Sequence, residues 1–176
     1  VAKPPLKEEL PYLPAIQDAG TKRELALAEI KRFIQWVQEV GLRLELGHVV
    51  AYYGKPYPTV DGLIYHARKQ DPGHTYSLDY LTAEEKGPLG LNPADIAVRC
   101  TITSSSGIRL AQRLGIVRQE ERIQTLEGRP EQARFPVVAA HPLEMAENRA
   151  MWDAYMDAYP LGLPAPDFKG EVNDTQ

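Results

Sequence analysis

The chain has little of what builds several common classes of protein. It contains one cysteine, Cys100, which excludes an internal disulfide framework and a zinc site made of cysteines. No apolar run approaches the roughly 18 residues that a membrane-spanning helix needs. Residues 1–10, VAKPPLKEEL, also lack the apolar stretch of a secretory signal, so we expect a cytoplasmic protein.

Catalytic and metal-binding motifs are missing as well. The histidines have no spacing that would bring two of them together as metal ligands, and Gly87–Gly90 lacks the pattern of a phosphate-binding loop. A hydrolase built on the His and Asp residues of segment 61–74 has only their proximity in its favour. Cys100 lies in the alternating run IAVRCTIT, which predicts a buried structural thiol. We therefore expect no enzyme, no catalytic residue, no bound metal and no cofactor.

Positive charge is concentrated in one segment and comes from arginine. Residues 99–134 contain seven arginines and four glutamates, a net charge of +3, whereas the whole chain has a formal net charge of -4. Arginine suits forked contacts with phosphate and stacking on bases. A solvated, salt-bridged surface would have the same composition, and charge alone favours that interpretation.

Local patterns predict helices and strands in the first half of the chain. Apolar residues at helical spacing predict a helix over 22–40, and Thr21 and Glu24 have the spacing of an N-terminal capping box. HVVAYY (48–53) and the extended run from Tyr57 predict a β-hairpin. A second helix is predicted to begin near Asp61 and to end in two basic residues, Arg68 and Lys69, which complement the helix dipole.

The second half completes an α+β pattern. Residues 71–95 predict a long surface loop, 96–103 predict a strand, and 108–134 stay open between strand and helix. Pro142, after His141, opens a long helix that runs to Tyr159. The predicted organisation is an extended arm (1–20), one domain (21–165) and a loose tail (166–176).

Aromatic and basic residues gather in one quarter of the chain. Six tyrosines lie between residues 52 and 80, together with Lys55, Arg68 and Lys69. Aromatic rings in a positively charged groove bind single-stranded nucleic acid, because every base has a face to stack and every phosphate a charge to neutralise. Alternation along 48–53 would bury every second residue, so we assign only Tyr53 and Tyr57 to a ligand.

Three longer stretches carry a resemblance to a known family. They are ELALAEIKRFIQWVQEVGLRLELGHVVAYYGKPYPTVDGLIYHARKQ (24–70), IAVRCTIT (96–103) and FPVVAAHPLEMAENRAMWDAYMDAYPLGLP (135–164). In this order and spacing they resemble the RecT/Redβ family of phage single-strand annealing proteins (recombinases). The last stretch is similar to the family's "HP–x–x–M" entry into a long helix that carries a basic residue and ends in an aromatic residue and proline. The matching positions here are His141, Pro142, Met145, Arg149, Tyr159 and Pro160.

The resemblance implies a β-β-β-α annealing-protein core with an N-terminal helix and a long C-terminal helix. It implies ATP-independent binding of single-stranded DNA and annealing of complementary strands in phage-type homologous recombination. It also implies protomers that pack into homo-oligomeric rings or filaments. The partners would be single-stranded DNA, the annealed duplex intermediate and further copies of the chain, but no membrane. A phage exonuclease or a host single-strand binding protein is a further candidate partner.

The resemblance also suggests residues for the DNA groove. By position, Arg149 would reach the phosphate backbone, while Lys55 and Arg68 or Lys69 would line the groove. From the local charge excess we add Arg109 and Arg113.

One feature departs from the family's pattern. The helix 143–159 has four acidic residues against the single Arg149, whereas the corresponding helix of relatives tends to be more basic. The alternative function is an oligomeric protein–protein interaction module without nucleic-acid binding. In that module the apolar last helix and the tyrosines would serve assembly alone.

Overall fold

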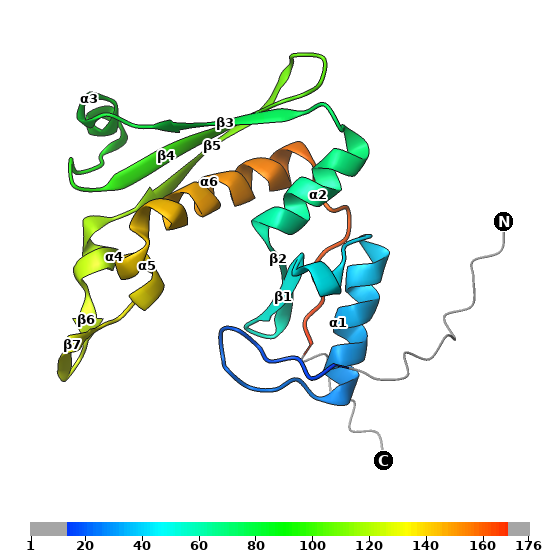
Figure 1. Ribbon diagram of the computed structural model, residues 1–176. Helices are drawn as coiled ribbons and strands as arrows, with labels where there is room; N and C mark the ends of the chain where they lie inside the picture. Colours follow the sequence, from blue (N-terminus) through cyan, green and yellow to red (C-terminus); the bar gives the residue numbers. More distant parts are fainter. Residues whose placement is uncertain (1–13, 169–176) are drawn as a thin grey trace. The chain divides into compact units, whose positions relative to one another are not determined.

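The computed structural model describes residues 14–168 and confirms the predicted α+β class (Figure 1). The chain divides into two compact units: unit 1 comprises Val1–Tyr57 and Leu163–Gln176, and unit 2 comprises Pro58–Gly162. Unit 1 thus joins residues from both ends of the chain, whereas the sequence predicted one domain over 21–165. No helix in the described part of the chain is both long and apolar enough to cross a membrane.

Unit 1 is built around one helix and one hairpin. Its elements are α1 (Leu27–Glu39), the 3-10 turn η1 (Leu44–Leu46), and the paired strands β1 (Val49–Tyr52) and β2 (Lys55–Pro58). The hairpin agrees with the prediction. Along β1, buried Val49 and Ala51 alternate with exposed Val50 and Tyr52, because successive residues of a strand point to opposite faces. The apolar face of α1, including the fully buried Phe33, supplies the core of this unit.

The predicted start of the first helix is wrong. α1 begins at Leu27, where the Glu29 carboxylate accepts a hydrogen bond from the Ala26 N–H at 2.6 Å. The capping box predicted at Thr21 does not form, because the Asp18 carboxylate already accepts the Thr21 N–H at 2.9 Å. The chain therefore makes a turn, rather than a helix, at this position.

The end of the described chain packs into unit 1, although a loose tail was predicted from residue 166. Phe168 is buried, and its ring meets that of Phe33 edge to face with 5.6 Å between centroids. The Arg32 Nη1 donates to the Phe168 carbonyl at 2.9 Å. The predicted arm up to residue 13 and the predicted tail from residue 169 lie outside the described residues.

Unit 2 is organised around a three-stranded antiparallel sheet of order β3-β4-β5. The strands are β3 (Thr75–Tyr80), β4 (Ile96–Thr103) and β5 (Arg109–Val117). β4 agrees with the predicted strand, and β5 occupies part of the segment that the sequence left open. The prediction of a loop over 71–95 is wrong, because this segment contains β3, with Leu78 paired to Cys100 of β4. It also contains the short helix α3 (Ala83–Lys86) and the turn η2 (Gly87–Leu89).

Helices pack on one face of this sheet. They are α2 (Val60–Gln70), the short α5 (Pro136–Ala140) and the long α6 (Pro142–Ala158). α6 crosses β4 and β5, and α2 packs beside α6 (Figure 1). The helix approaches β5 closely at Gly115, where an added Cβ would lie 1.8 Å from the Ala146 carbonyl oxygen. This interface also buries Cys100, and burial raises the pKa of its thiol to about 11, as expected for a structural cysteine.

The rest of segment 108–134, which the sequence left open, contains both a helix and strands. It contains α4 (Gln119–Ile123) and a second hairpin formed by β6 (Thr125–Leu126) and β7 (Arg129–Ala133). Buried Asp95 anchors the start of α4, since its carboxylate accepts the N–H groups of Gln119 at 2.8 Å and of Asn92 at 2.9 Å. The hydrogen bond from Gln119 is the main reason that the pKa of Asp95 lies below its ordinary value.

Candidate nucleic-acid interface

Three exposed tyrosines cluster on the β1–β2 hairpin of unit 1. Tyr52, Tyr53 and Tyr57 are 46%, 64% and 40% exposed and are termed the hairpin tyrosines below. The Tyr52 ring centroid lies 4.7 Å from that of Tyr53 and 5.7 Å from that of Tyr57. The sequence selected Tyr53 and Tyr57 but missed Tyr52, which is the central ring. The signal for it was the alternation of β1, in which burial of Val49 and Ala51 leaves Tyr52 on the outer face.

The Tyr53 backbone is held in an uncommon conformation at the tip of this hairpin. Tyr53 and Gly54 form the two-residue loop, and both have positive φ, 48° and 79°, as in a type I′ turn. A positive φ suits glycine but costs other residues about 1–3 kcal/mol. The Asp18 carboxylate stabilises the turn by accepting the N–H of Tyr53 at 3.0 Å and that of Gly54 at 2.7 Å. The exposed position of the Tyr53 ring is thus maintained by a buried anchor.

Asp18 is the electrostatic centre of this anchor. Its carboxylate also accepts the N–H groups of Gly20 and Thr21, at 2.9 Å each. Burial alone would raise the pKa of this carboxyl, but the four N–H donors outweigh burial and lower the pKa to about 2. Gly20 permits the close approach of the Tyr53 ring, since an added Cβ would lie 2.6 Å from two of the ring carbons.

Lys55 lies beside the hairpin tyrosines. In β2, exposed Lys55 and Tyr57 alternate with buried Pro56 and Pro58. Lys55 forms no ion pair with any of residues 14–168. The prolines have no N–H with which to pair a further strand, so β2 presents side chains rather than backbone donors. Exposed rings next to a cation are the combination that binds single-stranded nucleic acid.

Three further predicted residues lie at one end of unit 2, termed the basic end. Arg68 and Lys69 occupy the last turn of α2, and both are exposed. Asp71, just beyond that helix, accepts the N–H of Ser105 at 3.0 Å, which ties the helix end to the turn between β4 and β5. Arg109, also exposed, begins β5 directly after this turn. The fold therefore brings together cations that are far apart in the sequence.

Arg149, which the resemblance assigns to the phosphate backbone, is engaged inside unit 2. Its Nη1 and Nη2 donate to the two carboxylate oxygens of Glu121 at 3.1 and 2.8 Å, and Nη1 also donates to the Ile116 carbonyl. The two side chains are 38% and 29% exposed. The hydrogen bonds from Arg149 hold the pKa of the Glu121 carboxyl below its ordinary value. Arg149 therefore ties α6 to α4 and β5, and its contact with the phosphate backbone stays a prediction.

Several arginines of segment 99–134 are also paired with carboxylates. Arg113 bonds Asp157 on α6, and Arg99 and Arg118 lie 3.6 and 3.8 Å from carboxylate oxygens. This part of the segment is the salt-bridged surface that charge alone favoured as an interpretation. The local excess of positive charge therefore does not form a continuous row of unpaired arginines, and the predicted role of Arg113 in DNA binding stays a prediction.

The residues named for a hydrolase take part in packing. The Asp71 carboxylate accepts the Tyr159 O–H at 3.0 Å, and burial raises the pKa of that tyrosine to about 12. The His74 ring lies within hydrogen-bond distance of the Tyr155 hydroxyl, 3.0 Å from Nε2. These contacts join α6 to the segment that follows α2. Over residues 14–168, no group of three or more His, Cys, Asp or Glu side chains is placed to hold a metal ion.

Comparison of the chain with known protein families, with curated proteins and with solved structures finds no match. The likeness to annealing proteins therefore depends on the stretches 24–70, 96–103 and 135–164. The geometry adds two exposed features, each on its own unit: the hairpin tyrosines with Lys55, and the basic end.

Proposed function

We propose that this chain binds single-stranded DNA and anneals complementary strands without ATP, as a homo-oligomer of the kind that the RecT/Redβ resemblance implies. The observation that carries the proposal is the exposed cluster of hairpin tyrosines beside Lys55. Large aromatic rings gain most when they are buried, so three contacting rings left in water point to a ligand that covers them.

The two exposed features, each on its own unit, make different kinds of contact with DNA. Bases stack on the hairpin tyrosines, and each stacked base contributes about 1–3 kcal/mol with little dependence on sequence. Phosphates are neutralised by Lys55 on unit 1 and by Arg68, Lys69 and Arg109 on unit 2, with release of condensed counterions. Arg149 and Arg113 support the fold of unit 2 and make no direct contact in this account.

Annealing follows from holding one strand extended with its pairing edges accessible. A second strand samples registers against it, and correct registers extend while mismatched ones dissociate. The protein supplies alignment and charge neutralisation, and base pairing supplies the specificity. Side-by-side copies would multiply these contacts along one strand, which raises the overall affinity without a new kind of contact.

Fluorescence anisotropy with a labelled oligo-dT tests the proposal. We expect Tyr52→Ala and Tyr57→Ala each to weaken binding about tenfold, which corresponds to the loss of one stacked base. Tyr80→Ala, at a similarly exposed tyrosine on β3, is the matched control and should bind like the unmodified chain. Circular dichroism checks that each variant is folded. Wild-type affinity in both hairpin variants would remove the tyrosines from the site.

Annealing itself is measured by energy transfer between two labelled complementary oligonucleotides. The chain should accelerate duplex formation without nucleotide, and the hairpin variants should do so in proportion to their lower DNA occupancy. Binding without acceleration would retain the interface and contradict annealing.

A second function, the protein–protein module, is favoured by a different observation. Exposed apolar side chains concentrate between residues 123 and 143 of unit 2. They are Ile123, Leu126, Phe135, Val137 and Leu143. If the module is correct, sedimentation velocity should show assembly that Val137→Ser disrupts, together with no binding of oligo-dT.

A further inference from the structure

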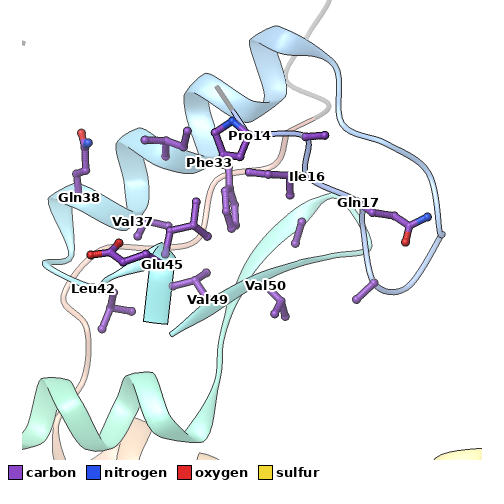
Figure 2. A pocket seen from close by; sticks show the side chains of 15 residues that line it. Pro14, Ile16, Gln17, Phe33, Val37, Gln38, Leu42, Glu45, Val49 and Val50 are labelled. Atoms are coloured by element: carbon purple, nitrogen blue, oxygen red, sulfur yellow. The ribbon is translucent and has the colours of Figure 1, made fainter. Parts of the chain in front are cut away.

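Unit 1 contains an apolar cavity that the proposed function does not use. Its volume is about 660 Å³, which is within the range of sites that take up small ligands or several side chains. α1, η1, β1 and the segment 14–19 form its walls (Figure 2). Phe33, Val37 and Leu42 contribute apolar surface to the lining.

One wall of the cavity is the edge of a strand. Val49, Val50 and Ala51 all line it, although successive residues of a strand point to opposite faces. Three consecutive strand residues can all line this cavity because the cavity runs along the edge of β1, where side chains of both faces can be reached. The Ala51 carbonyl accepts the N–H of Ala19, a turn residue, at 2.8 Å, so this edge accepts a backbone donor from the segment that follows Pro14. The geometry therefore fits an extended, apolar peptide segment.

We propose that this cavity is the docking site of the chain's own segment 1–13, with Leu10, Tyr12 and Leu13 as the side chains that fill it. Pro14 is part of the cavity lining, so the preceding residues start at its rim. A segment attached at this point acts at a high effective concentration, which favours it over a separate molecule.

The composition of the segment suits this role. Its prolines, at positions 4, 5 and 11, restrict the backbone to extended conformations and reduce the entropy lost on docking. The three apolar side chains would cover Val50, which is 36% exposed, and the partly buried Ile16 and Ile34 of the lining. Since Tyr52 belongs to β1, docking along the edge of this strand would also stabilise the hairpin that presents Tyr52. The inference does not depend on DNA binding.

Thermal unfolding of the full chain tests the docking. The variant carries Leu10→Ser, Tyr12→Ser and Leu13→Ser, in a Trp152→Phe background so that Trp36 reports on unit 1. We expect the Tm of unit 1 to fall by at least about 5 °C. The control carries Lys3→Ser, Lys7→Ser and Glu9→Ser and should melt unchanged. Equal Tm values for the apolar variant and the unmodified chain would overturn the proposal.

A peptide added in trans gives a second measurement. The full chain carrying Leu10→Ser, Tyr12→Ser and Leu13→Ser should gain Tm in a saturable manner with a synthetic peptide of residues 1–13, and not with the triple-serine peptide. Val50→Glu, which puts a charge at the cavity lining, should abolish the gain. If both peptides act alike, or if the peptide still stabilises the Val50→Glu chain, the segment does not dock in this cavity.

Discussion

Substitution of Arg149 by alanine separates a structural role from a DNA contact. The variant loses two N–H···O bonds to Glu121 and one to the Ile116 carbonyl. It also leaves the Glu121 carboxylate partly buried without its main partner. The structure therefore predicts that unit 2 becomes less stable, whereas a free phosphate-binding arginine would leave stability unchanged.

The expected size follows from the geometry. Hydrogen bonds to charged groups contribute about 1.5–3 kcal/mol each when buried, and the one-third exposure of this pair reduces that through solvent screening. We expect Arg149→Ala to lower the free energy of unfolding of unit 2 by about 2–3 kcal/mol. In a double-mutant cycle with Glu121→Ala, the coupling between the two side chains should be about 1–2 kcal/mol.

Urea unfolding followed by Trp152 fluorescence, in a Trp36→Phe background, measures these values for unit 2. Arg129→Ala, at an exposed arginine of β7, is the control and should change stability by less than about 0.5 kcal/mol. Anisotropy at a temperature where the Arg149→Ala chain is folded should show unchanged affinity for oligo-dT. A chain with wild-type stability, no coupling to Glu121 and weaker DNA binding would refute the structural role.

Five other outcomes follow from contacts described above. The logarithm of the association constant for oligo-dT should fall against the logarithm of salt concentration with a slope of about -3, since four cations contact phosphates; a flat dependence contradicts them. Asp18→Asn should lower the free energy of unfolding of unit 1 by about 2 kcal/mol in urea titrations. Because the pKa of Asp18 in the folded chain lies below its ordinary value, its contribution is present above about pH 4 and lost as pH falls toward 2; acid titration of unit 1 checks this sign. Gly115→Ala should destabilise unit 2 by about 3 kcal/mol or more, because its methyl group would overlap α6. Cys100 should react with a maleimide only under denaturing conditions.

Elements with strong local patterns could be predicted from the sequence. The strand 96–103, the hairpin around Gly54 and the long helix from Pro142 all agree with their predictions. In each of them, apolar spacing and the terminal residues point to the same structure. The start of α1 could not be predicted, because the Asp18 carboxylate accepts the Thr21 N–H that Glu24 would bond in a capping box.

Two strands of the main sheet escaped prediction for different reasons. In β3, Tyr76, Leu78 and Tyr80 alternate, but they are at most partly buried and follow a Pro-Gly pair, so the segment had the composition of a loop. In β5, the positions that face α6 include Arg113 and Gly115, which breaks the apolar alternation expected of a strand. The glycine is needed only because a helix distant in sequence packs there.

The candidate site shows the same limit. The types of residue at the hairpin followed from local patterns, and only the exposure of Tyr52 was missed. The engagement of Arg149 by Glu121, 28 positions earlier, depends on how α6 crosses the sheet. Nothing near Arg149 in the sequence distinguishes a cation that holds the fold from one that faces a ligand.

The most direct test of the account maps where DNA touches the protein. Oligo-dT that carries 5-iodouracil, irradiated in the complex, crosslinks preferentially to aromatic side chains stacked on its bases, and mass spectrometry locates the linked peptide. We predict crosslinks within residues 52–57, weakened in the Tyr52→Ala and Tyr57→Ala chains in proportion to their lower DNA occupancy. Crosslinks confined to other residues, or a folded chain that binds no oligo-dT at low salt, would contradict the proposed interface.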